Sequence, residues 1–355
     1  MSVLGMRVHR RTAAAIAVLI CGAPLVACGS SQNGTNGTTG AATTSIPSLT
    51  VAIANPAMDH APIYVAEGAK LFQKYGVNVT VQHQTGSNTL TLLSSKKVDL
   101  TDLPPPTAMI ATSKGFPMSI IYEVTTNTAL AMIAPRGVTS LAQLKNKSNC
   151  RIGTAEEGTV VYAATQLIKA RYGLNCTVVQ AASIPAVLAA VAAGSYQAGV
   201  VTYAAALTAT GTNILINPTQ YNQEFVQATQ SPLVVFFGLK DVLNTKRDAI
   251  VRFLRAITAA QKIIQTDPIS KVVALIQQDP DYKTVSLATM EKSLQPNLPY
   301  IGRSSPPGFI STTDWQNALQ SYTNWGVPGY SPSDAAYSYS NLIDMSFDNA
   351  SNQGS

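Results

Sequence analysis

Short apolar runs alternate with stretches of helical periodicity along most of this chain. Residues 49–54 and the alternating residues 77–81 predict strands, and apolar positions at helical spacing predict a helix over residues 60–75 that ends at Gly76. The same order continues with a helix from about Ser87 and with strands predicted at 98–101 and 118–122 and near residues 151, 178 and 198. Such repetition predicts parallel sheets with helices on both faces.

Beyond Val242 the pattern changes to helices. Apolar residues recur at helical spacing over 250–264, and Asp267-Pro268 ends this predicted helix. Trp315, Leu319 and Tyr322 form another apolar stripe. We expect these aromatic residues to belong to the core rather than to a ligand site.

The N-terminus has the three parts of a secretory signal. Three arginines within residues 7–11 precede an apolar stretch over about residues 13–26, which is shorter than the roughly 20 residues of a membrane-spanning helix. Residues 25–28, Leu-Val-Ala-Cys, then resemble a bacterial lipobox, in which Cys28 is lipidated with acyl chains such as palmitate and becomes the new N-terminus. The alternative is an ordinary signal peptide that happens to end in Cys.

The composition predicts a polar linker and a modest net charge. From Gly29 to about Ser45 the chain consists almost entirely of Gly, Ser, Thr, Asn, Gln and Ala, which predicts a flexible linker. The net charge of +6 counts three signal arginines; without them 21 basic residues stand against 18 acidic ones, which gives +3. No long basic run occurs, so nucleic-acid binding is not expected.

Two cysteines remain after the signal and the anchor. Cys150 and Cys176 each begin a predicted strand, with a predicted helix between the two strands. In a right-handed βαβ unit both strand starts lie on the same edge, so we predict a disulfide in an oxidising compartment. The alternative is a pair of buried thiols.

The body of the chain resembles a known family. Residues 51–66, with Gly68 and the motif Tyr75-Gly76-Val77, are similar to the opening of the nitrate/sulfonate/taurine-type substrate-binding proteins of ABC transporters. The proline-led turn of residues 103–108 and the segment 141–154 resemble later parts of the same family. Residues 186–199 do so too, except that Gln197 replaces the family's usual acidic residue. The resemblance covers about residues 46–347.

The resemblance implies an α/β, two-lobed type II periplasmic-binding-protein fold, in which each lobe is a mostly parallel sheet flanked by helices. It divides the chain into a signal peptide (1–27), an anchor and linker (28–46), lobe 1 (47–134 plus 236–347), lobe 2 (138–230) and a C-terminal tail (348–355). Two hinge crossings are expected near residues 129–136 and 232–239. A solute would bind in the cleft, and the lobes would close on it.

Ligands of open α/β sheets bind at the carboxyl ends of the strands, where helix N-termini present free N–H groups. That rule selects fourteen candidates, namely Asn55, Asp59, His60, Tyr64, Ser87, Asn88, Pro105, Thr107, Glu123, Thr125, Glu157, Thr159, Thr202 and Tyr203. Asp59 and Ser87 have a second interpretation as helix caps. Of Glu156 and Glu157, we expect only one to face the cleft.

The candidate loops favour a neutral or partly cationic ligand. Glu156 and Glu157 would oppose an anion at the start of a helix, where sulfonate and nitrate need positive potential, and no Arg clamp is evident in the loops. No phosphate loop, metal-ligand spacing or Ser-His-Asp order stands out, so neither a cofactor nor a metal site is expected, nor an enzyme.

The leading hypothesis is therefore a monomeric, lipid-anchored solute receptor on the extracytoplasmic face of the membrane. Its partners would be a small-molecule solute and an ABC permease with its ATPase. The alternatives are a pyrimidine-synthase-like enzyme and a surface lipoprotein that presents a ligand to a sensor.

Overall fold

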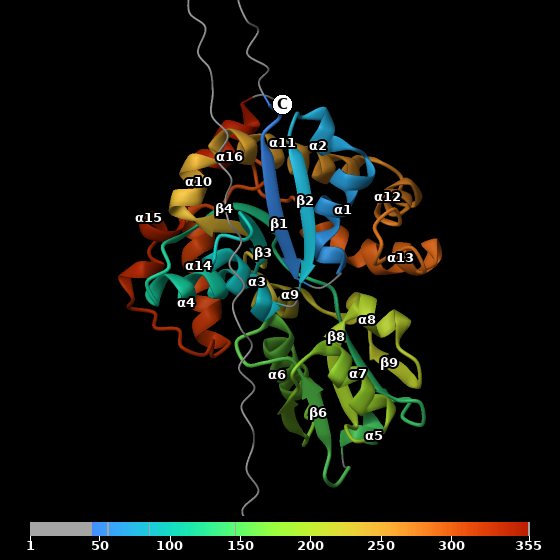
Figure 1. Ribbon diagram of the computed structural model, residues 1–355. Coiled ribbons are helices and arrows are strands. Elements are labelled where there is room, and N and C mark those ends of the chain that lie inside the picture. The colour runs from blue at the N-terminus through green and yellow to red at the C-terminus, as the bar shows by residue number, and fades with distance from the viewer. Residues whose placement is uncertain (1–44, 55–56, 85, 146, 354–355) are drawn as a thin grey trace, which may run out of the picture. The chain divides into compact units, whose positions relative to one another are not determined.

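Two five-stranded sheets organise the described part of the protein (Figure 1). The structure is a computed structural model that describes residues 45–54, 57–84, 86–145 and 147–353. The first sheet has the order β2 (Asn78–Gln84), β1 (Ser48–Ala54), β3 (Leu100–Leu103), β10 (Val234–Leu239) and β4 (Met118–Thr125). The second sheet has the order β7 (Thr177–Gln180), β6 (Arg151–Thr154), β8 (Ala198–Thr202), β5 (Leu130–Pro135) and β9 (Thr212–Ile216).

Helices and short 3₁₀ turns connect the strands. The helices and turns around the first sheet, before the chain passes to the second sheet, are η1 (Met58–His60), α1 (Ala61–Gly68), α2 (Leu71–Lys74), α3 (Gly86–Ser94) and α4 (Pro105–Ser113). Those around the second sheet are α5 (Ala142–Lys145), α6 (Val160–Tyr172), α7 (Ile184–Ala192), α8 (Tyr203–Thr208), η2 (Pro218–Gln220) and α9 (Gln223–Thr229). After β10 follow α10 (Lys240–Thr245), α11 (Arg247–Thr266), α12 (Ile269–Ile276), α13 (Leu287–Leu294), η3 (Gln295–Tyr300), α14 (Thr312–Asn324), η4 (Ala335–Tyr337), α15 (Tyr339–Leu342) and α16 (Ser346–Asn352). Within the described ranges, none of the helices is long and apolar enough to cross a membrane.

Each sheet is parallel except for one strand. β10 runs antiparallel to β3 and β4, and β5 runs antiparallel to β8 and β9. Both strands come directly after the chain has left the other sheet, so each arrives from the opposite direction. The prediction of mostly parallel sheets is confirmed, with this one exception in each sheet.

The chain crosses between the sheets twice, and the two crossings are bonded to each other. Ser231 N donates to Thr126 O at 3.0 Å, Leu233 N donates to Thr125 O at 2.9 Å, and Asn127 Nδ2 donates to Thr229 Oγ1 at 3.0 Å. β5 belongs entirely to the second sheet and β10 entirely to the first, so both crossings come a few residues earlier than the sequence predicted.

A third connection holds the crossings to the helices of the first sheet. The buried Asn297 of η3 accepts the N–H of Ala129 at 2.9 Å through its Oδ1, and its Nδ2 donates to Ser293 O at 2.8 Å. The path from β4 to β5 is therefore fixed from two sides.

The predicted helix over residues 60–75 is broken into two helices. α1 ends at Gly68 and α2 begins at Leu71, with Lys70 in the left-handed region at φ 56°. A Cβ on Gly68 would lie 2.4 Å from Leu275 O, so α1 approaches the backbone of α12 more closely than any other residue would permit. Tertiary packing of α1 thus overrides the continuous apolar pattern.

The apolar stripes lie where the sequence predicted. Ile250, Phe253, Leu254, Ile257 and Ile264 are buried on α11, whose C-cap is Asp267, and Trp315 and Tyr322 are buried on α14. One hydrophobic core runs from the first sheet to the α6 face of the second sheet, whereas the α7 face has a small core of its own.

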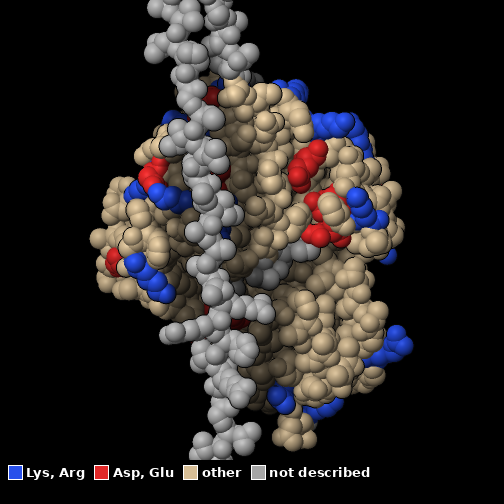
Figure 2. All heavy atoms as spheres, viewed as in Figure 1, with Lys and Arg blue, Asp and Glu red and all other residues tan. Residues whose placement is uncertain are grey.

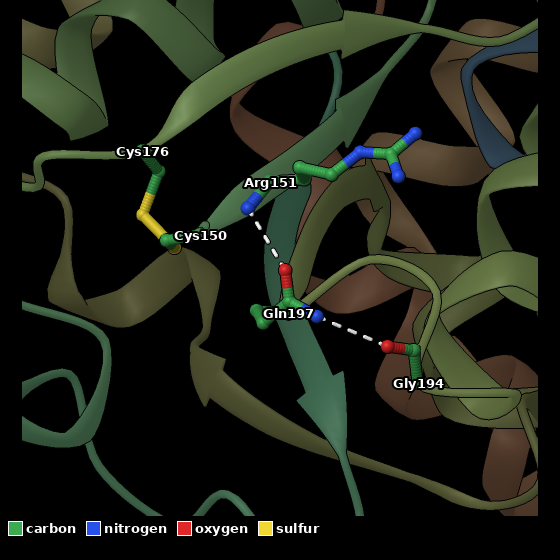
Figure 3. The surroundings of a disulfide bond; sticks show 5 residues. All are labelled: Cys150, Arg151, Cys176, Gly194 and Gln197. Carbon is green, nitrogen blue, oxygen red and sulfur yellow. Dashed lines mark hydrogen bonds between the residues drawn. A yellow bond between two sulfur atoms is a disulfide. The ribbon is translucent and has the colours of Figure 1, made fainter. Parts of the chain in front are cut away.

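A disulfide joins Cys150 and Cys176 at the starts of β6 and β7 (Figure 3), as predicted. Beside it, Gln197 Oε1 accepts the N–H of Arg151 at 2.9 Å and Gln197 Nε2 donates to Gly194 O at 3.0 Å. An amide can do both, whereas a carboxylate at this position could only accept. Gln197, at which the chain departs from the family pattern, therefore has a structural role.

The C-terminal segment as far as residue 353 is part of the fold. The predicted tail at 348–355 begins inside α16, where Asp348 and Ser351 are buried, and Arg255 of α11 donates to the carbonyls of Ala350 and Ser351. The signal peptide, Cys28 and most of the linker lie outside the described residues.

The loop before α6 contacts the segment after α14. A Cβ built on Gly158, which has φ +84°, would lie 2.7 Å from Val327 Cα and 2.8 Å from Pro328 Cδ. The preceding residue on the same loop, Glu157, approaches Gly326. These contacts join an element of the second sheet to an element that packs on the first.

We predict that Gly158→Ala destabilises the protein more than Gly194→Ala does. Both glycines have positive φ and so share a strain of roughly 1–2 kcal/mol, but nothing lies within 4 Å of a Cβ at Gly194. The clash at Gly158 should add roughly 1–3 kcal/mol. Urea unfolding of the two variants measures the difference, and equal losses would show that the contact contributes nothing.

Candidate functional site

Buried polar groups gather where the strands of the first sheet end. β1 leads into η1 and α1, which carry Asp59, His60 and Tyr64. Asp102 is the second-last residue of β3, just before the prolines at the start of α4. β1 and β3 are neighbouring parallel strands, so their carboxyl ends lie at the same edge. The arrangement brings three of the predicted residues beside an aspartate that was not predicted.

His60 is held between two aspartates. Its Nδ1 lies 2.5 Å from Asp102 Oδ2, and its Nε2 lies 3.7 Å from Asp59 Oδ1. All three side chains are buried. Burial alone would lower the pKa of His60, but the charges of Asp102 and Asp59 outweigh it and raise that pKa to about 9. The imidazole is therefore a cation at neutral pH.

Asp59 does not cap a helix. Neither η1 nor α1 has a side-chain cap, and Asp59 Oδ1 is buried without a hydrogen bond. The capping interpretation is wrong for this residue. Its carboxylate instead supplies negative charge to the edge of the first sheet.

A second group of side chains adjoins the first through aromatic contacts. Tyr64 stacks on His83 with ring centroids 6.3 Å apart and meets Tyr282 edge-on at 5.1 Å. His83, near the end of β2, lies 3.4 Å through Nε2 from Asp279 Oδ2 and 2.6 Å through Nδ1 from Asp281 Oδ2. These three residues form the one group in the described part of the chain whose ligand atoms could hold a metal ion.

The surroundings of the group formed by His83, Asp279 and Asp281 are acidic. Acidic side chains gather on the face near α1, α12 and α13 (Figure 2). Burial and the charge of Asp279 raise the pKa of Glu67 on α1 to about 7, and His83 offsets only part of that rise.

Glu123 is buried on the face of β4 opposite Tyr122. Tyr122 donates to Gln261 of α11, whereas Glu123 is close to Ser304 and Asp314. Burial and the charge of Asp314 raise the pKa of Glu123 to about 8, so its carboxyl is neutral at pH 7. Thr125, at the end of the same strand, keeps its hydroxyl buried without a hydrogen bond.

The residues predicted in the second sheet act mainly at helix starts. Thr159 Oγ1 accepts the N–H of Tyr162 and caps α6, and Thr202 Oγ1 accepts the N–H of Ala205 and caps α8. Tyr203 packs on the small core of the α7 face. Glu156 and Glu157 are both exposed.

The remaining predicted residues lie apart from the His60 group. Asn88 is exposed and donates to Gln84, Pro105 is buried at the start of α4, and Thr107 is half-buried. Asn55 lies outside the described residues, and the side chain of Ser87 is not described.

A cavity of about 500 Å³ lies between α6, α9 and the end of α14. Amide side chains line it, including Gln166, Gln227 and Asn324, and Trp325 closes one wall while donating to Ala228 O. None of the predicted residues lines this cavity.

Five residues of these two groups were not predicted from the sequence: Asp102, His83, Asp279, Asp281 and Tyr282. Asp102 had a signal, since a charged residue in a short strand that is buried throughout needs a partner. The Asp279-Pro280-Asp281 motif lies far along the chain from His83, and nothing in the periodicity connects them.

Comparison with known proteins agrees with this architecture. The model of the family described as NMT1/THI5 like matches residues 57–270. None of the curated proteins compared with the chain matches it.

Three solved structures illustrate the fold. A Candida albicans gene product described as having the generic periplasmic binding protein fold is 16% identical, with 84% of this chain and 96% of that chain covered and a TM-score of 0.60. The periplasmic nitrate-binding protein NrtA from Synechocystis is 14% identical (87% and 89% covered, TM-score 0.62). The periplasmic aliphatic sulphonate-binding protein SsuA from Escherichia coli is 15% identical (79% and 94% covered, TM-score 0.55). The chain therefore has the periplasmic-binding-protein fold, as the sequence predicted.

We predict that stability falls between about pH 6.5 and pH 9 because of His60. The folded protein holds the His60 proton more tightly than the unfolded chain, so this stabilisation is complete below about pH 6.5 and is lost as the pH passes about 9. A shift of this size corresponds to roughly 3 kcal/mol.

Chemical unfolding at each pH measures the effect. His60→Gln and Asp102→Asn should lose this part of the pH dependence. Asp241→Asn, which removes an exposed ion pair with Lys96, should keep it. Parallel profiles for the protein and His60→Gln would contradict the prediction.

Proposed function

Because the chain belongs to the NMT1/THI5-like family, we propose that it is an extracytoplasmic solute-binding lipoprotein that delivers its ligand to an ABC importer. The nitrate-binding and sulphonate-binding proteins that share its fold support binding rather than catalysis. In this proposal the protein is a monomer, and the elements around the first and second sheets are lobes that close on the solute.

The observation that best supports this proposal is the position of the two crossings between the sheets. β4 ends at Thr125, and β5 begins at Leu130, which pairs with Thr202 at the carboxyl end of β8. Five residues span at most roughly 18 Å, so the carboxyl ends of β4 and β8 are kept close together. A ligand bound at these ends would contact both lobes, and the paired crossings would serve as the hinge.

The charges at the site support a neutral or cationic solute. Asp59 and Asp102 flank one cation, His60, so the group has an excess of negative charge. Glu123 adds a neutral carboxyl, and Glu157 adds an exposed carboxylate on the opposite sheet. An anion would meet unfavourable charge here, whereas an amine or a protonated heterocycle could bind a carboxylate.

A thermal-shift screen tests both the function and the ligand class. We predict that some amines or pyrimidines raise the unfolding midpoint, because a ligand that binds only the folded state stabilises it. Asp59→Asn should reduce the shift, and the distant Asp241→Asn should not. Tight binding of taurine or an alkanesulfonate without binding of amines or pyrimidines would overturn the ligand class. Failure of every solute class would count against the function.

The proposed anchor is the lipidated Cys28. The signal and lipobox resemblance support it, and the polar linker would hold the folded body near its permease. The anchor thereby explains how a binding protein stays at the extracytoplasmic face.

We predict that Cys28→Ser moves the protein from the membrane fraction to the soluble extracytoplasmic fraction. A serine has no thiol to acylate. Fractionation of expressing cells with immunodetection measures the distribution, and Cys150→Ser, which leaves the anchor in place, is the control. Membrane association of Cys28→Ser equal to that of the unchanged protein would refute the anchor.

A further inference from the structure

Three side chains from distant parts of the chain form a compact group beside the proposed ligand site. His83 is the second-last residue of β2, and Asp279 and Asp281 lie in the connection between α12 and α13. Their possible ligand atoms all lie within 4.8 Å of one another. The side chain of Asp279 is 2% exposed and that of His83 is 31% exposed, so the group has a buried side and an open side.

The distance between His83 and Asp279 suits a shared metal ion. Zn²⁺ binds imidazole nitrogen and carboxylate oxygen at about 2.0–2.1 Å, and tetrahedral ligands at that distance lie about 3.3–3.4 Å apart. His83 Nε2 and Asp279 Oδ2 are 3.4 Å apart. A direct hydrogen bond between them would be shorter, at about 2.7–2.9 Å for a charged pair.

Asp281 occupies the position of an outer partner. Its Oδ2 lies 2.6 Å from the other ring nitrogen of His83, Nδ1. Histidines that bind metal almost always donate the remaining ring N–H to a carboxylate, carbonyl or water, which fixes the tautomer and the ring orientation. The stacked ring of Tyr64 further restricts the imidazole plane.

We propose that His83 Nε2 and Asp279 Oδ2 bind a divalent cation of the zinc class, with Asp281 orienting the imidazole. Glu67 on α1 is near enough to both ligands to interact with their charges, but it is not among the residues whose ligand atoms gather there. Water completes the coordination on the open side.

The ligand set selects the type of ion. Imidazole suits zinc and other late first-row metals, whereas magnesium and calcium prefer sites made only of oxygen ligands. An ion here would join β2 to the α12–α13 connection. Tyr282 in that connection packs on Tyr64. The ion would therefore also stabilise the contact between these two aromatic rings, which lies next to Asp59.

The competing explanation is a histidinium ion paired with both aspartates. It requires no metal and accounts for the short Nδ1 contact. It leaves the longer Nε2 separation as a weak ion pair, and it predicts that Zn²⁺ competes poorly for the site.

Titration with ZnCl₂ distinguishes the two. The untagged full chain would carry Cys21→Ser and Cys28→Ser, so that no free thiol outside the Cys150–Cys176 disulfide binds zinc. After EDTA treatment and buffer exchange, calorimetry should show one equivalent of Zn²⁺. Excess Zn²⁺ should raise the unfolding midpoint more than equal Mg²⁺ or Ca²⁺ does.

Matched variants locate the site. His83→Gln and Asp279→Asn should each weaken Zn²⁺ binding at least tenfold, whereas Asp281→Asn should weaken it about 10–100-fold and keep one equivalent. Asp241→Asn, an exposed carboxylate elsewhere, should bind like the parent. Circular dichroism in EDTA checks folding, and the partly exposed His83→Gln decides the question if Asp279→Asn misfolds.

Absence of binding by the parent, or unchanged affinity in a folded His83→Gln variant, would overturn the proposal. Because neither result depends on the solute, this experiment is independent of the proposed transport function.

Discussion

Neither sheet of this protein is complete without a strand that arrives from the other. β10 fills the gap between β3 and β4 after returning from the second sheet, and β5 fills the gap between β8 and β9 after leaving the first. The crossings that deliver these strands bond to each other between Thr125 and Leu233. The position of the carboxyl ends of the strands, and hence of every candidate ligand group, depends on this exchange.

The sequence predicts much of this architecture because local patterns determine it. The alternation of 77–81, the stripe on α11 and the spacing of Cys150 and Cys176 each depend on neighbours in one element or one βαβ unit. Periodicity does not reveal an antiparallel strand, because β5 and β10 read as apolar in either direction. The break after Gly68 depends on the close approach of Leu275, which no local pattern records.

The residues of the candidate site likewise fall into those that the sequence predicts and those that it does not. The rule about strand ends selects Asp59, His60 and Tyr64, which the structure places at the edge of the first sheet. It gives no information about partners, so it misses Asp102 at 2.5 Å from His60 and the two aspartates around His83. It also selects Thr159 and Thr202, whose hydroxyls are engaged in capping. Which polar side chain meets a ligand depends on what else it already binds.

The two sheets are secured by groups of different kinds. At the first sheet, a buried imidazolium between two carboxylates holds the start of α1 against β3, and such a group loses its charge in alkaline medium. At the second sheet, the amide of Gln197 and a disulfide hold β6 beside its neighbours, and neither takes up or releases a proton. The protein would therefore respond to alkali unequally: the elements at the first sheet would loosen while those at the second sheet kept their geometry.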